Sequence, residues 1–172
     1  MKVINIHGYH GNPENSAYTA LNELKAEIIS PYLDYDSETP DNILENLCKL
    51  IKENNPDIIV GTSLGGFFAT ILSVRTDIPA ILINPALMPF LHLPRLGYKG
   101  DVKAYISLFG ELAGLKTDKI HTIIGGSDDV IDTHDFTKNL LYNEKFRTVP
   151  EGKHSGATLP LKEYFTYVLS NY

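Results

Sequence analysis

The chain has 172 residues, of which 43% are hydrophobic and 21% are charged, as is ordinary for one globular domain with a sizeable core. The formal net charge is −6 and there is no basic run, which argues against nucleic acid or an anionic membrane as a partner. The single cysteine, Cys48, excludes an internal disulfide, and its place in an apolar helical pattern predicts a buried, inert thiol. Residues 1–6 have the pattern of a strand and not of a secretory signal, and no segment approaches the roughly 18 apolar residues of a membrane span, so a cytosolic protein is expected.

In the first part of the chain, short β-branched runs alternate with amphipathic segments. The predicted strands are residues 2–6, 27–33 and 57–62. Asn12 and Pro13 predict the start of a helix that runs to about residue 25, because Asn caps helices and Pro is tolerated at the first helical position. Thr39 and Pro40 repeat this pattern, and the helix that they begin is expected to end at residues 54–56, Asn-Asn-Pro.

The rest of the chain continues the alternation. The predicted helices are residues 67–74, 101–115, 132–142 and 160–170, the predicted strands are 79–84, 119–124 and 145–149, and residues 85–100 are predicted to be irregular. This order predicts a single α/β domain over residues 1–172, with a mostly parallel sheet of about six strands and helices on both faces. Functional sites in such sheets form at the carboxyl ends of the strands.

Residues 57–66 combine a β-branched run with a Gly-x-Ser-x-Gly motif, and a helix-compatible segment follows at once. A nucleophile elbow requires this strand–turn–helix context, because a sharp turn lifts one hydroxyl above the sheet. The neighbours must be small for the backbone to pass, and Gly61 and Gly65 meet that need. Ser63 is therefore predicted to be a nucleophile, with a surface serine in an ordinary turn as the alternative.

A serine hydroxyl is a weak nucleophile and needs a base within hydrogen-bonding reach. His154 follows the last predicted strand and Asp128 follows the strand before it, so the chain order of Ser63, Asp128 and His154 is that of a known type of catalytic triad. The carboxylate would fix the tautomer of the imidazole and stabilise the imidazolium that forms. The alternative for His154 is a loop histidine with no partner.

Three neighbouring acids compete for the role of the triad carboxylate. Asp128 is favoured because it stands two residues before the apolar pair Val130-Ile131, in a Gly-x-x-Asp-x-Val pattern that begins at Gly125. Asp129 is the second choice, with a solvated side chain as its alternative. Asp132 is expected to cap the next helix.

Acyl transfer also needs N–H donors for the oxyanion that forms on the substrate. The backbone N–H groups of Leu64, at the start of the predicted helix, and Tyr9, in the loop after the first strand, are expected to supply them. Tyr9, His10 and Met88 are expected to line the substrate-binding site, with a solvent-facing position as the alternative for His10. His7 is predicted to have a structural role.

Residues 85–115, rich in Pro and Leu, are a candidate cap over the pocket. Their apolar side chains predict an acyl site or, as the alternative, a satellite of the core: Leu87, Met88, Phe90, Leu91, Leu93 and Leu96. No metal-binding spacing such as His-Glu-x-x-His is present, so the other histidines are interpreted as structural or surface residues: His92, His121 and His134. No metal or organic cofactor is therefore expected.

These motifs together resemble the α/β-hydrolase superfamily and, more closely, its small bacterial YqiA-type esterases. The matching segments spread over nearly the whole chain: residues 6–9, 61–70, 83–86, 89–90, 128–132 and 152–154. The resemblance implies a minimal α/β-hydrolase that begins at the third strand of the full fold and acts on small acyl esters. It assigns the triad to Ser63, Asp128 and His154, and the oxyanion donors to Tyr9 and Leu64. The chain departs from this group at positions 11–12 and 155–156, which are expected to border the acyl site.

The sequence thus predicts a serine hydrolase that acts through an acyl-enzyme on small to medium acyl groups in carboxylic esters or thioesters. Its partner would be a small-molecule substrate, and the sequence predicts no oligomeric state. Two alternatives from other classes remain. One is a non-catalytic binding protein on the same fold, in which the triad geometry is lost, and the other is a serine peptidase or amidase.

Overall fold

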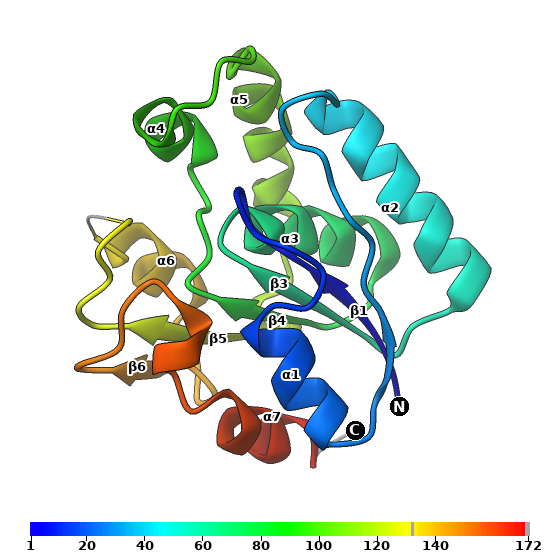
Figure 1. Cartoon of the computed structure of the whole chain (residues 1–172), viewed down its shortest axis with the longest axis vertical. Coiled ribbons are helices and arrows are strands. Elements are labelled where there is room, and N and C mark those ends of the chain that lie inside the picture. Colours follow the sequence, from blue (N-terminus) through cyan, green and yellow to red (C-terminus); the bar gives the residue numbers. More distant parts are fainter. Residues whose placement is uncertain (132, 171–172) are drawn as a thin grey trace.

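Six parallel strands form one sheet at the centre of the protein, in the order β2-β1-β3-β4-β5-β6 (Figure 1). The computed structural model describes residues 1–131 and 133–170. The strands are β1 (Lys2–Ile6), β2 (Glu27–Ile29), β3 (Ile58–Thr62), β4 (Ala80–Ile83), β5 (Ile120–Gly125) and β6 (Arg147–Val149). This sheet confirms the predicted α/β class, and its parallel order places the carboxyl ends of the strands along one edge.

Helices cover both faces of the sheet, as predicted (Figure 1). The α-helices are α1 (Ser16–Glu23), α2 (Pro40–Asn54), α3 (Leu64–Thr76), α4 (Pro89–His92), α5 (Lys103–Phe109), α6 (Asp135–Leu141) and α7 (Leu161–Leu169). Short 3₁₀ helices lie at Leu93–Leu96, Gly110–Gly114, Thr117–Lys119 and Gly156–Thr158. Because successive side chains of a strand point to opposite faces, β3 directs Ile58 and Val60 toward α1 and α7, and Ile59 toward α2 and α3.

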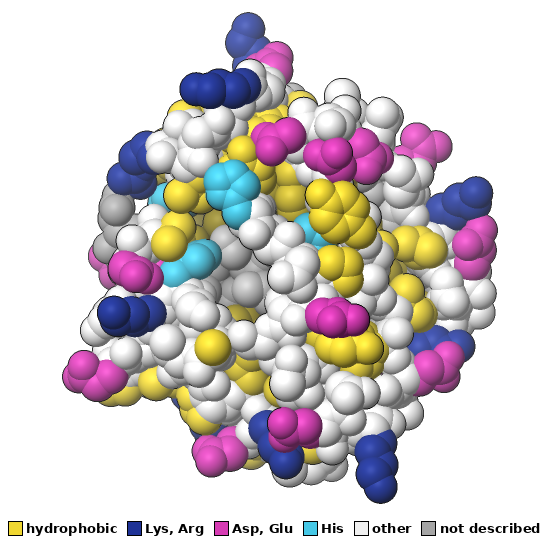
Figure 2. All heavy atoms as spheres, in the orientation of Figure 1, with side chains coloured by type: hydrophobic (Ala, Val, Ile, Leu, Met, Phe, Trp, Pro, Cys, Tyr) yellow, Lys and Arg dark blue, Asp and Glu magenta, His cyan; other side chains and the backbone are white. Residues whose placement is uncertain are grey.

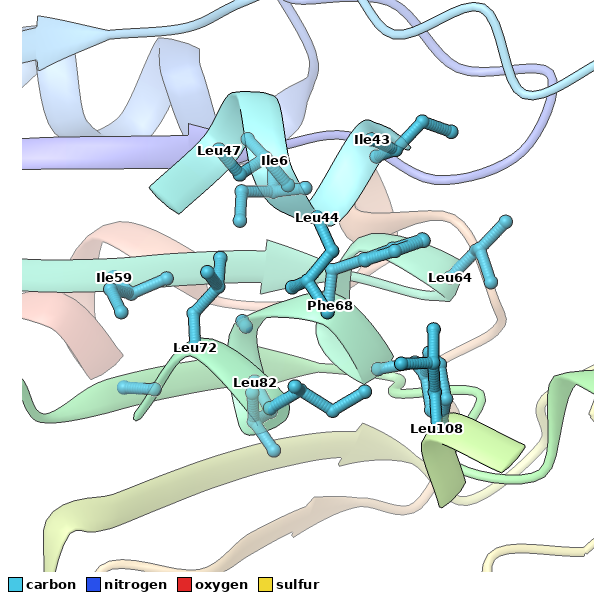
Figure 3. Packing of buried hydrophobic residues seen from close by; sticks show 14 of the residues in the cluster. Ile6, Ile43, Leu44, Leu47, Ile59, Leu64, Phe68, Leu72, Leu82 and Leu108 are labelled. Carbon is cyan, nitrogen blue, oxygen red and sulfur yellow. The ribbon is translucent and has the colours of Figure 1, made fainter. Parts of the chain in front are cut away.

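The larger hydrophobic core lies between the sheet and helices α2, α3 and α5 (Figure 3). The first ten residues of α3 are all buried, which explains why its sequence is mostly apolar on every side instead of amphipathic. The ring of Phe68 stacks on that of Tyr35 with their centroids 6.0 Å apart, and Leu64 is only 1% exposed. Since these side chains anchor the first turns of α3 in the core, they also fix the residue just before the helix, Ser63.

The start and end of α2 follow the predicted pattern. The hydroxyl oxygen of Thr39 caps the helix by accepting from the N–H of Asn42 at 3.2 Å, and Pro40 is the first helical residue. Asn55 ends the helix in the left-handed conformation, with a φ of 48°. Cys48, predicted to be buried, is only partly buried, because it lies at the side of the apolar face and merely borders the core.

The start of α1 differs from the prediction. The helix begins at Ser16, not at Pro13, and its cap is Asn15, not Asn12. The side-chain oxygen of Asn15 accepts from the N–H of Tyr18 at 3.0 Å and from Nδ2 of Asn5 at 3.2 Å. Asn5 is a fully buried residue of β1 whose amide needs partners, so this tertiary contact selects Asn15 as the cap.

Other boundaries also differ from the prediction: the helix predicted at residues 101–115, for example, is α5 followed by the 3₁₀ helix Gly110–Gly114. Strand β2 ends at Ile29, because the chain then turns so that the N–H of Leu33 donates to the ring of His7 at 3.0 Å. Residues 85–100, predicted to be irregular, contain α4 and the 3₁₀ helix that follows it. Helix α6 begins at Asp135, and the predicted cap Asp132 lies outside the described residues. No described helix has the length and apolar character that crossing a bilayer requires.

Candidate active site

Ser63 stands on the sharp turn between β3 and α3. Its φ of 55° and ψ of −117° form a conformation that residues with a Cβ rarely adopt. A Cβ on Gly65 would collide with the carbonyl oxygen of Ile6, and one on Gly61 would collide with that of Gly65. The glycines of the motif therefore let β1, β3 and α3 pack closely, with the Ser63 hydroxyl at the carboxyl edge of the sheet.

The fold brings Ser63, His154 and Asp128 together from the ends of three strands. Nε2 of His154 lies 3.0 Å from Oγ of Ser63, and Nδ1 of the same ring lies 2.9 Å from Oδ2 of Asp128. The Asp128 side chain is 2% exposed and that of His154 is 18% exposed. A buried carboxylate thus holds one nitrogen of a partly accessible imidazole, while the other nitrogen faces the serine hydroxyl.

Asp128 has partners besides His154. Its Oδ1 accepts from the backbone N–H groups of Val130 at 2.9 Å and Ile131 at 2.8 Å. Burial by itself raises the pKa of this carboxyl, but hydrogen bonds from His134, His154 and the two N–H groups outweigh it and hold the pKa well below its usual range. Asp128 is therefore an ionised hydrogen-bond acceptor at neutral pH.

A second histidine shares this carboxylate. Nε2 of His134 lies 2.9 Å from Oδ2 of Asp128, the same oxygen that faces Nδ1 of His154, and the His134 side chain is 4% exposed. The sequence predicts a structural or surface position for His134 and does not indicate this contact. No periodicity or motif marks it in the sequence, because only the fold of the loop after β5 brings it to the carboxylate.

Two further polar residues fix the loop that carries His154. Asn84, fully buried after β4, donates through Nδ2 to the carbonyl oxygens of Lys153 and His154, both at 2.9 Å. Its Oδ1 accepts from the N–H of Gly125 at 2.7 Å. Asp129, the second choice for the triad acid, instead accepts from the backbone N–H of His154 at 3.2 Å. The sequence shows Asn84 at a strand end, but it does not show these partners.

Tyr9 and Leu64, the predicted oxyanion donors, line the same small cavity as Ser63. Leu64 is the first residue of α3, so its N–H has no acceptor within the helix and lies at the positive end of the helix dipole. Tyr9 lies in a turn that the N–H of Gly11 closes by donating to the carbonyl of Gly8 at 3.0 Å. A Cβ on Gly8 would come within 2.9 Å of the Cβ of Ser63, so this turn passes directly beside the serine.

The side chains of the same turn are held in place. The Tyr9 hydroxyl donates to Oδ1 of Asp36 at 2.8 Å, and burial, together with this carboxylate, raises the pKa of Tyr9 to about 12. The ring of His10 stacks on that of Tyr9 with centroids 4.0 Å apart. Tyr9 is therefore a neutral phenol at physiological pH, and its ring forms a fixed wall next to the serine.

His7 has a different environment from His154. The N–H of Leu33 donates to its Nε2 at 3.0 Å, so the ring proton lies on Nδ1, which donates to the carbonyl of Gly8 at 2.8 Å. Burial lowers the pKa of His7. Both ring nitrogens are thus occupied by the backbone, as a structural role requires. Across residues 1–131 and 133–170, no group of three or more His, Cys, Asp or Glu side chains is placed to hold a metal ion.

Ser63 borders two cavities of very different size. The larger has a volume of about 330 Å³ and is also lined by Tyr9, His10 and His154. The smaller has a volume of about 10 Å³ and is covered by one helical face of residues 89–96. On the face of the molecule in Figure 2, histidine and hydrophobic side chains surround a hollow in the surface. Met88, predicted to bind substrate, lines neither cavity, because it precedes α4 and lies off that helical face.

The fold has counterparts among solved structures. An alpha/beta-superfamily protein from Xanthomonas campestris pv. campestris is 17% identical with a TM-score of 0.71, and the match covers 99% of this chain and 98% of that one. A structure from a study of carboxylesterases of Nitrososphaera gargenis is 15% identical with a TM-score of 0.65, covering 99% and 89%. An alpha/beta hydrolase enzyme from a sediment metagenome of the Mar Chica lagoon, Morocco, is 12% identical with a TM-score of 0.67, also covering 99% and 89%. The chain therefore has the α/β-hydrolase fold.

The family to which this chain belongs is shown by its sequence. The sequence profile of UPF0227, described as an uncharacterised protein family, matches residues 2–107, and this chain belongs to that family. The comparisons confirm the resemblance inferred from the sequence. The matched part contains Tyr9 and the Ser63 motif and ends before Asp128 and His154.

Proposed function

We propose that this protein is a serine hydrolase that cleaves carboxylic esters or thioesters through an acyl-enzyme. The observation that carries the proposal is the hydrogen-bonded chain from Ser63 through His154 to Asp128, with 3.0 Å between Oγ and Nε2 and 2.9 Å between Nδ1 and Oδ2. A base at this distance is what a serine hydroxyl needs to become a nucleophile. The occurrence of esterases among the structures that share the fold supports the same reaction.

In the first half of the reaction, Oγ of Ser63 attacks the carbonyl carbon while Nε2 of His154 takes the hydroxyl proton. The backbone N–H groups of Tyr9 and Leu64 stabilise the negative charge that develops on the carbonyl oxygen, and the dipole of α3 adds to that stabilisation. His154 then gives the proton to the departing alcohol or thiol, which leaves the acyl group on Ser63. Water, deprotonated by His154, releases the acid and restores the serine.

The surrounding residues keep these groups in position. Asp128 holds the imidazole with its proton on Nδ1, so that Nε2 is free to accept the serine proton. His134 acts as a positioning residue, because its hydrogen bond to Oδ2 holds the carboxylate in place. Asn84 acts similarly on the loop of His154. Residues 85–115 form the cap, since one helical face of this segment covers Ser63.

The proposal is tested by labelling the purified protein with a fluorophosphonate probe and by measuring the hydrolysis of p-nitrophenyl esters. The wild type is expected to be labelled at Ser63, and Ser63→Ala is expected to lose the labelling and about 10⁴-fold or more of the rate. Ser107→Ala, at an exposed serine of α5, is the matched control and is expected to behave like the wild type. A folded wild type with neither labelling nor hydrolysis would favour a non-catalytic binding protein.

A serine peptidase or amidase is the remaining alternative. The two reactions are separated by comparing p-nitrophenyl acetate with its anilide analogue, p-nitroacetanilide, at the same enzyme concentration. An esterase is expected to hydrolyse the ester and to leave the anilide intact, because the amine is a much poorer leaving group. Turnover of the anilide that disappears in Ser63→Ala would assign the protein to the amidases.

A further inference from the structure

Ser63 lies between the two cavities, and the chemistry decides which half of an ester each cavity receives. In the proposed serine hydrolase, on which this assignment rests, His154 must protonate the leaving alcohol or thiol. That half of the substrate therefore lies on the side where His154 is exposed. His154 lines the larger cavity, whereas the described residues that line the smaller one do not include it. The acyl half consequently faces the smaller cavity, where Tyr9 and Leu64 stand beside Ser63.

The acyl cavity is small and almost entirely apolar. Its volume of about 10 Å³ is close to the minimum of ~10–15 Å³ that a cavity needs to hold one water molecule. Ala86, Val130 and Ile131 form its walls beside the sheet. The remaining cover consists of residues that recur at helical spacing and share one face of the cap: Pro89, His92, Leu93 and Leu96. A methyl group is therefore at the upper limit of this space, and a longer chain would have to displace the cap.

The alcohol cavity, in contrast, is wide and continues along the surface. Ser16 and Gly156 line both this cavity of about 330 Å³ and a neighbouring groove of about 540 Å³ beside α1 and α7. Gly11 and Ser155, where the sequence departs from the YqiA-type esterases, also line the larger cavity. Under this assignment, Gly11 and Ser155 lie on the side of the leaving group, not at the acyl site where the sequence predicts them.

We infer that this enzyme is selective for acyl groups of the size of acetyl, in esters or thioesters whose alcohol or thiol half is large. With such an ester, Oγ of Ser63 forms a bond to the acetyl carbon, the bond from that carbon to the alcohol oxygen breaks, and the serine proton passes through His154 to that oxygen. Water then supplies OH to the acetyl carbon and H to Ser63, and acetic acid leaves.

The test is a series of p-nitrophenyl acetate, butyrate and hexanoate, with each kcat/KM divided by the rate of alkaline hydrolysis of the same ester. For the wild type, this corrected kcat/KM is expected to fall at least about tenfold from acetate to butyrate, because one methylene too many in an apolar pocket costs roughly tenfold or more. A bulkier leaving group, in 4-methylumbelliferyl acetate, is expected to cause no comparable loss.

Two variants widen the acyl cavity from opposite walls. Leu96→Ala shortens a partly exposed residue of the cap, and Val130→Ala shortens the wall beside Asp128 without removing any backbone hydrogen bond. Each is expected to raise the corrected kcat/KM for butyrate relative to acetate by about tenfold. Leu91→Ala is the control, because Leu91 is 51% exposed on the same segment and lines neither cavity.

Three outcomes would overturn the inference. One is a corrected kcat/KM for butyrate or hexanoate that equals or exceeds that for acetate in the wild type. Another is an effect of Leu91→Ala as large as those of Leu96→Ala and Val130→Ala. In each of these two outcomes, Ser63 still reacts with the fluorophosphonate probe, so the proposed serine hydrolase function is not contradicted. The third, absence of labelling and of any ester hydrolysis, would overturn the proposed function as well.

Discussion

Two regions at the carboxyl edge of the sheet each hold a histidine by both ring nitrogens, but with different partners. In the loop after β1, backbone groups of Gly8 and Leu33 bind the two nitrogens of His7. In the loops after β5 and β6, side chains do so, since His154 lies between the carboxylate of Asp128 and the hydroxyl of Ser63. His7 is 1% exposed, whereas 18% of the His154 side chain is exposed.

This difference separates a histidine that supports the fold from one that can transfer a proton. A ring bonded to a backbone N–H and a backbone carbonyl has no partner that can exchange a proton with it. A ring between a carboxylate and a hydroxyl can take the hydroxyl proton while the carboxylate stabilises the resulting charge. His134 combines features of both, because it is buried like His7 but bonded to Asp128.

The contrast between His7 and His154 would be wrong if Asp128 did not control the reaction. Asp128→Asn is expected to lower kcat by roughly 10³- to 10⁴-fold, because the amide favours the wrong tautomer of His154. Asp129→Asn, which alters only the acceptor for the His154 N–H, is expected to cost far less. The measurement is kcat with p-nitrophenyl acetate, and circular dichroism checks that both variants fold. If Asp129→Asn proved the more damaging, the assignment of the acid would be wrong.

Substitutions of His134 test whether this residue supports the fold, like His7, or the reaction, like His154. His134→Phe removes the donor to Asp128 but keeps an aromatic ring at the site, and it is expected to lower kcat by roughly 10- to 100-fold with KM nearly unchanged, because the carboxylate loses its fixed position. His134→Gln keeps an N–H near the position of Nε2 and is expected to recover most of the rate. A purely structural His134 would instead change the melting temperature of both variants and leave kcat per folded molecule as it is.

At His7, a substitution is expected to lower stability and not activity. In His7→Asn, the side-chain amide can still donate to the carbonyl of Gly8, but the N–H of Leu33 loses its acceptor. One buried, unpaired N–H is expected to lower the free energy of unfolding by about 2 kcal/mol and to leave kcat nearly unchanged. Urea unfolding and kcat are measured on the same preparation. A fall in kcat with unchanged stability would show that the loop after β1 takes part in the chemistry beyond its support of Tyr9.

The smallest expected effect concerns the strained turn at Ser63. Its φ of 55° costs a residue with a Cβ about 1 to 3 kcal/mol, whereas glycine makes the unfolded chain freer by only roughly 0.4 to 1 kcal/mol. The inactive Ser63→Gly is therefore expected to be more stable than the wild type, by a fraction of a kcal/mol to about 2 kcal/mol, and Ser63→Ala should show little of this gain. Urea melts fitted with a common slope provide the comparison. If Ser63→Gly unfolded at a lower urea concentration than Ser63→Ala, the prediction that the backbone is strained at Ser63 would be wrong.

Local patterns were sufficient to predict much of this protein. The alternation of β-branched runs and helical segments predicts the six-stranded parallel sheet, because each pattern depends on residues only a few positions apart. Thr39 and Pro40 predict the start of α2 for the same reason. The order of strands then indicates which loops share an edge, and this was enough to predict that Ser63, Asp128 and His154 lie together, as the distances show.

Tertiary structure alone decided the features that depend on partners distant in the chain. Asn15, not Asn12, caps α1 because the buried amide of Asn5 bonds to it across the fold. His134 reaches Asp128 only through the path of the loop after β5. The sizes of the two cavities beside Ser63 depend on how the cap packs over the sheet edge. A sequence pattern encodes the type and spacing of side chains along one element, but the distance between atoms on separate elements is set by packing, which no local pattern contains.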